Sequence, residues 1–545
     1  MRNVMGKKLP KALRSTKSLL AAVLGAAAFV TTSSSAEAAT HTWKGVSPGT
    51  DTAPKDGAWN TAANWTGGAI GASDTLVFGG NTSYTSTDDI SGSYKAALIT
   101  LNNTSTNGIT ISGGTLGDSA MSINQDGSAS VLFGTNVTLK GATVTLGGTG
   151  NGVLTFGGAL AGSSNGQQLT ISKSGSYTFI LSGTATTFVT ALNVTGGVFQ
   201  IGNGGTTGSL DATTITNTAT VSFNRSDSVT FANTINGTAG NVTQIGAGTT
   251  ILTANNGYTG ATTISAGTLQ IGSGSTTGSL GTGTVTNTAT LSFNRSNSMT
   301  VANTINGTGG NVSQIGAGTT ILTASNGYTG GTTVTNGTLR VNNTSGSGTG
   351  TNAISVSNGA TLGGSGTIGT TVTNTGVTVA AGGKLSPGAG DATAGVLTMS
   401  LSGTGKLDIS SAVAASNTKA LVFDLNGLAG GNTSDKIVIS NGDANVANTS
   451  LAIGSSVLEW NDFDFRGWNN LATGQYVLID TSETISGSLG SVVSGNLGWA
   501  TGTIAFANSN QDIVLDLTVT PEPGSIGLLS TLALPALLKR RRRVL

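Results

Sequence analysis

One 25-residue stretch occurs twice in this chain, at a spacing of 70 residues. It reads IGAGTTILTANNGYTGATTISAGTL at residues 245–269 and IGAGTTILTASNGYTGGTTVTNGTL at residues 315–339. Both copies belong to a longer repeat, because residues 200–269 align without a gap on residues 270–339, with roughly three quarters of the positions identical. A more diverged copy lies upstream, between residues 175 and 202. A fixed period of this kind indicates a structural unit that stacks on copies of itself.

Within each period, short segments of alternating apolar and polar residues are separated by turn residues. Alternate positions are apolar in residues 289–294, as expected for a strand with one buried face. Asn256-Gly257 and Asn326-Gly327 indicate turns, and no helix-length segment separates the strands. The chain has 85 Gly in 545 residues, with 9% charged and 5% aromatic residues, which disfavours helices and a thick core. The regular placement of apolar residues argues against a disordered chain.

Short periodic strands without crossover helices suit a β-solenoid, a propeller or a string of sandwiches. A propeller blade takes about 40 to 45 residues, and a sandwich needs a larger apolar core. A solenoid coil of about 20 to 25 residues fits three times into the period. We therefore predict an all-β fold, a parallel β-helix with strands about 4.8 Å apart. Residues 70 apart should lie three coils apart, with Leu252 and Leu322 both pointing inward.

The two ends of the chain differ in composition from the part between them, which suggests five segments. Both ends look like targeting segments, and the C-terminal one should form a short hydrophobic helix. The predicted order is a signal peptide at 1–38, an N-terminal β-region and cap at 39–170, a β-solenoid at 171–394, a capping β-domain at 395–520 and a sorting tail at 521–545.

The N-terminal segment has the layout of a secretory signal. Six basic residues precede an apolar stretch from Leu19 to Val30, and Ala36-Glu37-Ala38 offers a small-x-small cleavage site. We expect signal peptidase to leave Ala39 as the first mature residue. Without both terminal segments, Lys plus Arg falls from 24 to 13 and Asp plus Glu from 23 to 21, a net charge of −8. Such a body lacks the clustered basic surface that nucleic-acid binding requires.

The C-terminal segment has three parts in order: Pro521-Glu522-Pro523, an apolar run from Ile526 to Leu538, and Lys539-Arg540-Arg541-Arg542-Arg543. The run has 13 residues, whereas a membrane-spanning helix needs about 20. The cations should stay on the cytoplasmic side of the membrane. This layout resembles the PEP-CTERM sorting tail of Gram-negative bacteria. The resemblance implies transient anchoring in the inner membrane, recognition by an exosortase-type membrane protease, and release to the cell surface or extracellular matrix.

The repeated stretch resembles the autotransporter-associated β-strand repeat. That resemblance implies a right-handed parallel β-helix displayed outside the cell, often as an adhesin or surface scaffold. Autotransporters also need a long C-terminal membrane barrel, for which residues 395–520 are too few, so we expect a capping β-domain there. The resemblance is carried by residues 246–269 and 316–339, by 359–368 and 382–388, which are similar to the end of such arrays, and by 43–78, which resembles their beginning.

The distribution of titratable residues argues against catalysis. Between Asp227 and Asp391 there is no Asp or Glu, and His41 is the only histidine. Acid–base and glycosidase mechanisms need titratable pairs, and Ser-His catalysis needs a histidine base. We expect His41 to be mobile near the mature N-terminus, and Asp88-Asp89 to form a solvated turn rather than a polysaccharide-cleaving site. The sequence therefore predicts no enzyme, no cofactor and no metal site.

Two clusters near the C-terminal end leave alternatives open. Glu459, Asp462 and Asp464 could bind a divalent ion weakly, but a solvated loop is the preferred interpretation. The aromatic residues Trp460, Phe465 and Trp468 could stack on sugars, although packing inside the cap is favoured. A calcium β-roll is rejected, because the glycine-rich segment 363–368 has Ile368 where the motif needs a carboxylate.

A non-catalytic structural or adhesive surface protein is the leading functional hypothesis. A carbohydrate-binding β-helix is the second, with an extracellular polysaccharide held on the Thr-, Asn- and Ser-rich flank of the solenoid. A glycan-active enzyme is the third.

Overall fold

The computed structural model describes most of the chain between the two expected targeting segments. The described residues, which begin at Ala39, belong to one compact unit. The predicted cleavage residues Ala36 and Ala38 and the sorting tail at 521–545 lie outside the described residues. The described residues are 39–44, 58–71, 74–80, 84–94, 97–106, 108–117, 120–135, 137–161, 168–183, 186–187, 189–370, 376–388, 394–402, 404–414, 419–426, 434–441, 450–467 and 471–520.

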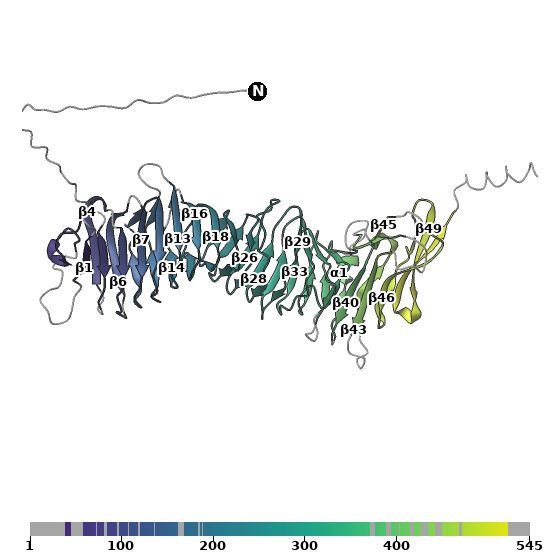
Figure 1. The fold of residues 1–545 in the computed structure, drawn as a ribbon. Coiled ribbons are helices and arrows are strands. Elements are labelled where there is room, and N and C mark those ends of the chain that lie inside the picture. The colour runs from purple at the N-terminus through teal and green to yellow at the C-terminus, as the bar shows by residue number, and fades with distance from the viewer. Residues whose placement is uncertain are drawn as a thin grey trace, which may run out of the picture. The chain divides into compact units, whose positions relative to one another are not determined.

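This unit is a parallel β-solenoid, which confirms the predicted fold class. Each complete coil passes over three faces, and the strands of successive coils pair in parallel. Figure 1 shows the strands following one another along one direction, from β1 to β46. In the described residues the remaining elements are short: α1 (Ser410–Val413), η1 (Ala62–Asn64), η2 (Trp460–Asp462) and η3 (Asn508–Asn510).

The first face is built from two sheets in succession. In pairing order the first contains β2 (Trp65–Thr66), β1 (Thr40–Trp43), β3 (Thr75–Phe78), β5 (Leu98–Leu101), β7 (Ala120–Gln125), β10 (Thr143–Gly147), β13 (Leu169–Lys173), β16 (Val189–Val194), β18 (Ala212–Asn217), β21 (Thr234–Gly237) and β24 (Gly257–Tyr258). The second contains β29 (Ser298–Val301), β32 (Thr319–Leu322), β34 (Thr338–Val341), β36 (Thr361–Gly364), β39 (Lys384–Pro387), β42 (Leu421–Asp424) and β45 (Phe463–Arg466).

The second face also consists of two sheets. The first contains β4 (Tyr84–Tyr94), β6 (Ile109–Leu116), β8 (Val131–Phe133), β11 (Leu154–Phe156), β14 (Thr178–Leu181), β17 (Val198–Ile201), β19 (Thr220–Phe223), β22 (Asn241–Gln244), β25 (Thr262–Ile264), β27 (Val285–Asn287) and β30 (Ile305–Asn306). The second contains β37 (Thr367–Gly369), β40 (Val396–Leu401), β43 (Lys436–Asn441), β46 (Gly474–Thr481), β50 (Asp512–Val519), β49 (Ala500–Ala507) and β48 (Ser494–Asn496).

The third face begins with three strands that join the second face through the long strand β6 and continues as a separate sheet. The three strands are β9 (Thr138–Lys140), β12 (Ala159–Ala161) and β15 (Thr186–Thr187). The sheet contains β20 (Ser228–Phe231), β23 (Thr249–Leu252), β26 (Thr268–Ile271), β28 (Thr290–Phe293), β31 (Asn311–Gln314), β33 (Thr332–Val334), β35 (Ile354–Val356), β38 (Val377–Val379), β41 (Leu407–Asp408), β44 (Leu451–Leu458) and β47 (Ile485–Leu489).

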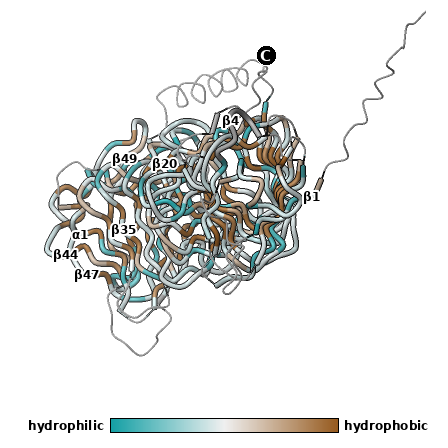
Figure 2. Tube along the Cα trace, turned by 90° about the vertical axis from the view of Figure 1, so that its left-hand side faces the viewer, coloured by the Kyte–Doolittle hydropathy of each residue, from teal (hydrophilic) through white to brown (hydrophobic). Residues whose placement is uncertain are grey.

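The core runs through the inside of the coils. Inward positions of successive strands stack in columns, such as Leu252, Ile271 and Phe293, all of which are buried. Viewed along the stack, hydrophobic positions gather toward the inside of the coils and polar positions toward the outside (Figure 2). At the N-terminal coil, Trp43 packs edge-on against Trp65 with ring centroids 4.9 Å apart. Repeated backbone ladders and this narrow apolar column stabilise the chain without a thick core.

The prediction that residues 70 apart lie three coils apart is wrong, although Leu252 and Leu322 are both buried as expected. Leu252 is in register with Ile271, then Phe293, then Gln314, so three coils take 62 residues. Leu322 lies one strand further along, on the next face, where it pairs with Val301. The repeat is therefore three coils plus one strand position long, and equivalent strands β17, β26 and β34 lie on three different faces.

The extra strand position is taken by a glycine-rich loop, which the sequence does not reveal as part of a coil. The three equivalent loops are residues 203–210, 273–280 and 343–350, and each lies next to the strand that opens a new sheet: β20, β29 and β37. Backbone hydrogen bonds join each loop to the neighbouring coil, as from Ser226 N to Gly205 O at 3.0 Å. Each face is thus interrupted once, and three faces become five sheets.

Parallel pairing crosses both predicted limits of the solenoid, residues 171 and 394. It starts with β1 and β3, and β40 pairs in parallel with both β37 and β43. Antiparallel strands lie at both ends of the stack: β2 pairs with β1 at the first coil, and β50, β49 and β48 follow β46 in the last sheet. A capping role for residues 395–520 stays a prediction.

Candidate functional site

A bulge in β44 opens a pocket beside helix α1. Ala452 pairs with Ser486 and Val457 with Ser488, so the segment between them is displaced from the ladder. Gly454 has φ of 74°, and a Cβ at this position would lie 2.7 Å from the Cβ of Ser410 in α1. A glycine is therefore required both for the left-handed backbone and for the close approach of the helix.

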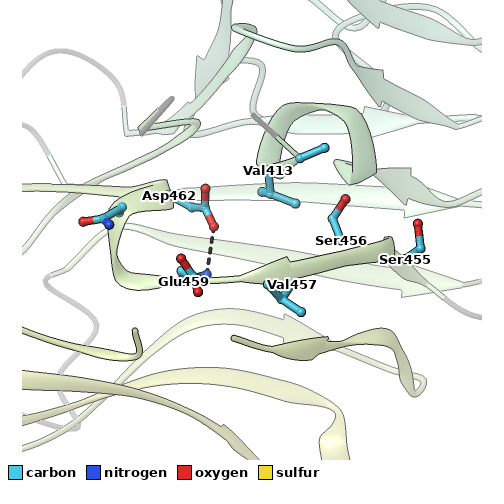
Figure 3. Close-up of a pocket in the computed structure, with 8 residues that line it drawn as sticks. Val413, Ser455, Ser456, Val457, Glu459 and Asp462 are labelled. Carbon is cyan, nitrogen blue, oxygen red and sulfur yellow. Dashed lines mark hydrogen bonds between the residues drawn. The ribbon is translucent and has the colours of Figure 1, made fainter. Parts of the chain in front are cut away.

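The pocket has a volume of about 290 Å³. It is lined by Val413 and Ala414 at the end of α1, Ser455, Ser456 and Val457 of β44, and Glu459, Asn461 and Asp462 around η2. In Figure 3 the helix carrying Val413 lies above β44, Ser456 points toward the helix, and the carboxylate of Asp462 points toward Glu459. The Ser456 hydroxyl donates to the Ser410 carbonyl at 3.1 Å. Apolar, hydroxyl, amide and carboxylate groups thus face one small cavity.

Glu459 and Asp462 form a capping box at the start of η2. The backbone N–H of Glu459 donates to Asp462 Oδ2 at 2.8 Å, and the N–H of Asp462 donates to the Glu459 carbonyl at 3.0 Å. Burial, reinforced by the Glu459 charge, raises the pKa of Asp462 to about 6 despite the backbone hydrogen bond. Within the described part of the chain, neither carboxylate forms an ion pair.

Asp464 faces a different environment from the other two carboxylates. It lies 3.4 Å from Lys419 Nζ and 2.9 Å from Arg466 Nη2. Although burial opposes it, hydrogen bonding and charge from Arg466 hold the Asp464 pKa below its usual value. The described residues contain no group of three metal-binding side chains. The solvated-loop interpretation is wrong for Asp462, which is buried in the capping box of η2.

The neighbouring aromatic residues pack inside the fold. The rings of Trp460 and Phe465 are 5.2 Å apart, and Phe465 is buried. Gly495 and Gly502 lie against the Trp460 indole, where a Cβ would be 2.1 Å and 2.8 Å from ring atoms. The packing interpretation is confirmed for these two aromatic residues, while Trp468 lies outside the described residues.

His41 is a fixed, buried residue, so the expectation that it is mobile is wrong. It belongs to β1, which pairs with both β2 and β3. Its Nε2 lies 2.9 Å from Asp74 Oδ2. Asp74 also accepts hydrogen bonds from the backbone N–H of Gly71, at 2.6 Å, and of Ala39, at 3.0 Å. The predicted first mature residue, Ala39, is thereby tied to the first coil.

Asp88 does not lie in a solvated turn, contrary to prediction. It is part of β4, is 4% exposed and is in register with Gly113. A Cβ on Gly114 would lie 3.0 Å from the Asp88 carboxylate. Asp88 faces inward by the alternation of β4, since Ser86, two residues before it in the same regular register, is also buried.

A buried lysine is a feature that the sequence interpretation missed. Lys173 ends β13 and is fully buried. Its Nζ donates to the carbonyls of Gly175 and, at 3.1 Å, Gly196, and lies 4.1 Å from the Tyr177 ring centroid. Burial lowers the pKa of Lys173 to about 8. The Gln244 side chain makes a similar hydrogen bond to the Gly246 carbonyl at 2.8 Å. A polar residue at a strand end, followed two positions later by glycine, is therefore the sequence pattern that could have indicated this bond.

Comparison with known proteins finds a repeat family in segments that form coils of the solenoid. Residues 242–271 and 312–341 match the family model Passenger-associated-transport-repeat, and these segments include β23 to β26 and β32 to β34. The chain is also 36% identical over 95 residues to "Adhesin BmaC autotransporter" of Brucella suis biovar 1 (strain 1330). That alignment covers 17% of this chain and 3% of the relative. The chain therefore carries autotransporter-associated β-strand repeats, and the sorting-tail resemblance stays a prediction.

Proposed function

We propose that this protein is exported to the cell surface or extracellular matrix, where it acts as a non-catalytic structural or adhesive component. The observation that carries the proposal is the parallel β-solenoid, which contains two segments that match the passenger-associated repeat. Stacked coils present long, regular surfaces to partners. Similarity to part of an adhesin supports an adhesive role.

The proposal includes processing at both ends. Signal peptidase would cut after Ala38, and the new α-ammonium of Ala39 would then meet the Asp74 carboxylate, 3.0 Å from the present amide nitrogen. An exosortase-type protease would recognise Pro521-Glu522-Pro523, while the cations at 539–543 hold the tail at the inner membrane. In the described residues, no helix is long and apolar enough to span a membrane.

A carbohydrate-binding role is the second candidate, and a row of outward hydroxyl groups favours it. Ser313 and Thr333 are in register on the third face, and Thr333 Oγ1 donates to Ser313 Oγ at 2.9 Å. Ser355 and Thr378 follow them in the same column and are exposed. A flat column of hydroxyls could pair with the hydroxyls of an extracellular polysaccharide. A glycan-active enzyme ranks third, because the coils between Asp227 and Asp391 contain no carboxylate.

Two experiments on cells test the proposal. Fractionation of wild-type cells should recover the protein in the surface or extracellular fraction. Cells from which the gene is deleted should retain less matrix material. Incubation of the purified protein with polysaccharides should release no products. Exclusive recovery from the cytoplasm would refute an exported role, whereas release of sugar fragments would favour the enzyme.

A further inference from the structure

We propose that the pocket beside α1 binds the ammonium group of an amino sugar in an extracellular polysaccharide. The inference rests on the proposed location outside the cell. It assigns a chemical class of ligand to one defined site near the C-terminal coils.

Charge is the first reason. Glu459 and Asp462 face the cavity, and within the described residues neither has an ion-pair partner. The nearby cations Lys419 and Arg466 lie against Asp464 instead. Because a buried carboxylate without a counter-ion is costly, the pocket favours a cation that arrives with the ligand.

The remaining lining indicates an organic cation rather than a metal ion. Ca²⁺ and Mg²⁺ prefer oxygen ligands on all sides, whereas Val413 and Val457 form part of this wall. Val457 is 40% exposed, so its methyl groups are available to a ligand. The volume of about 290 Å³ lies near the lower end of ligand pockets, which begin at about 300 Å³, and suits one small ring.

Neutral polar groups favour a sugar over a lysine side chain of a protein. Ser455, Ser456 and Asn461 offer hydroxyl and amide groups beside the carboxylates. The hydroxyls of a sugar ring can pair with these groups, while its C–H face contacts the valines. An alkyl ammonium chain would offer no hydrogen-bond partner to Ser455 and Asn461, which weakens its binding relative to a sugar.

Titration calorimetry with the purified full protein tests the inference, using a glucosamine tetramer as the probe. The fully acetylated tetramer and a lysine-containing peptide serve as comparisons. We expect the glucosamine tetramer to bind at least tenfold more tightly than either. Equal affinity for the acetylated tetramer, or no binding, would overturn the inference. Tighter binding of the peptide would assign the pocket to a protein partner instead.

Two conservative variants locate the binding. Glu459→Gln and Asp462→Asn should each weaken glucosamine-tetramer binding at least tenfold, with unchanged circular dichroism. Asp464→Asn is the matched control and should bind as the wild type does, since this carboxylate lies outside the pocket. If both pocket variants bind normally, the site is elsewhere. Cell fractionation of the same variants separates the two proposals, because surface location without sugar binding refutes only this inference.

Discussion

Polar side chains at strand ends donate to buried carbonyls of the turn that follows, and Lys173 also reaches Gly196 in the next coil. Lys173→Leu leaves the carbonyls of Gly175 and Gly196 without their buried donor, so we expect the free energy of unfolding to fall by about 2 kcal/mol. Lys173→Gln should retain most of the stability, because Gln244 and Gln314 bond to carbonyls in the same way. Denaturant titration of the wild type and the two variants measures these free energies of unfolding. An equal loss of stability in both variants would argue against stabilisation by these hydrogen bonds.

The pocket carboxylates predict a bell-shaped pH dependence of amino-sugar binding. As pH falls through about 6, Asp462 takes up a proton and the attraction for an ammonium weakens. Glu459 is the other titratable group that lines the pocket. At higher pH, the sugar ammonium loses its own proton. Calorimetry across this range should show the maximum between the two limits, and Asp462→Asn should flatten the acidic side. A wild-type affinity that stays constant from pH 7 to 5 would contradict this role of Asp462.

At the scale of elements, two of the three glycine-rich loops are held by arginines from the next coil. Arg295 donates to the carbonyls of Gly278, at 2.9 Å, and Thr276, so Arg295→Ala should loosen the loop at 273–280. Hydrogen exchange in that loop should accelerate at least tenfold. The equivalent loop at 203–210, held by Arg225, is an internal control and should not change. Uniform acceleration in both loops would indicate general destabilisation instead.

These loops also explain where sequence interpretation succeeded and failed. Alternation of apolar residues predicts the strands, and the repeat predicts their stacking, because both depend on local burial. The length of a coil depends on the loops that connect its strands, and nothing in the sequence of residues 203–210 shows that this loop occupies a whole strand position. The burial of Asp462 likewise depends on a short 3₁₀ turn. Such features become visible only when neighbouring coils are placed together.

At the scale of the whole molecule, each coil contacts only its neighbours. A destabilising substitution should therefore act mainly on its own coil and the two beside it. Leu322→Asp places a carboxylate in the apolar column and should cost several kcal/mol, about 2 to 7. Ile321→Asp is the control on the same strand, because Ile321 points outward and is only partly buried. Thermal unfolding should show a large decrease in melting temperature for the first variant and a small one for the second. Equal decreases would contradict the assigned orientation of β32.

The central claim is that this solenoid is an exported, processed surface protein. Mass spectrometry of peptides released by protease from intact cells tests it most directly. We expect peptides from residues 39–520, an N-terminus at Ala39, and none from 526–538. Peptides that run through 526–538 would show that the tail is retained and contradict sorting. Detection of this chain only after cell lysis would contradict the surface location itself.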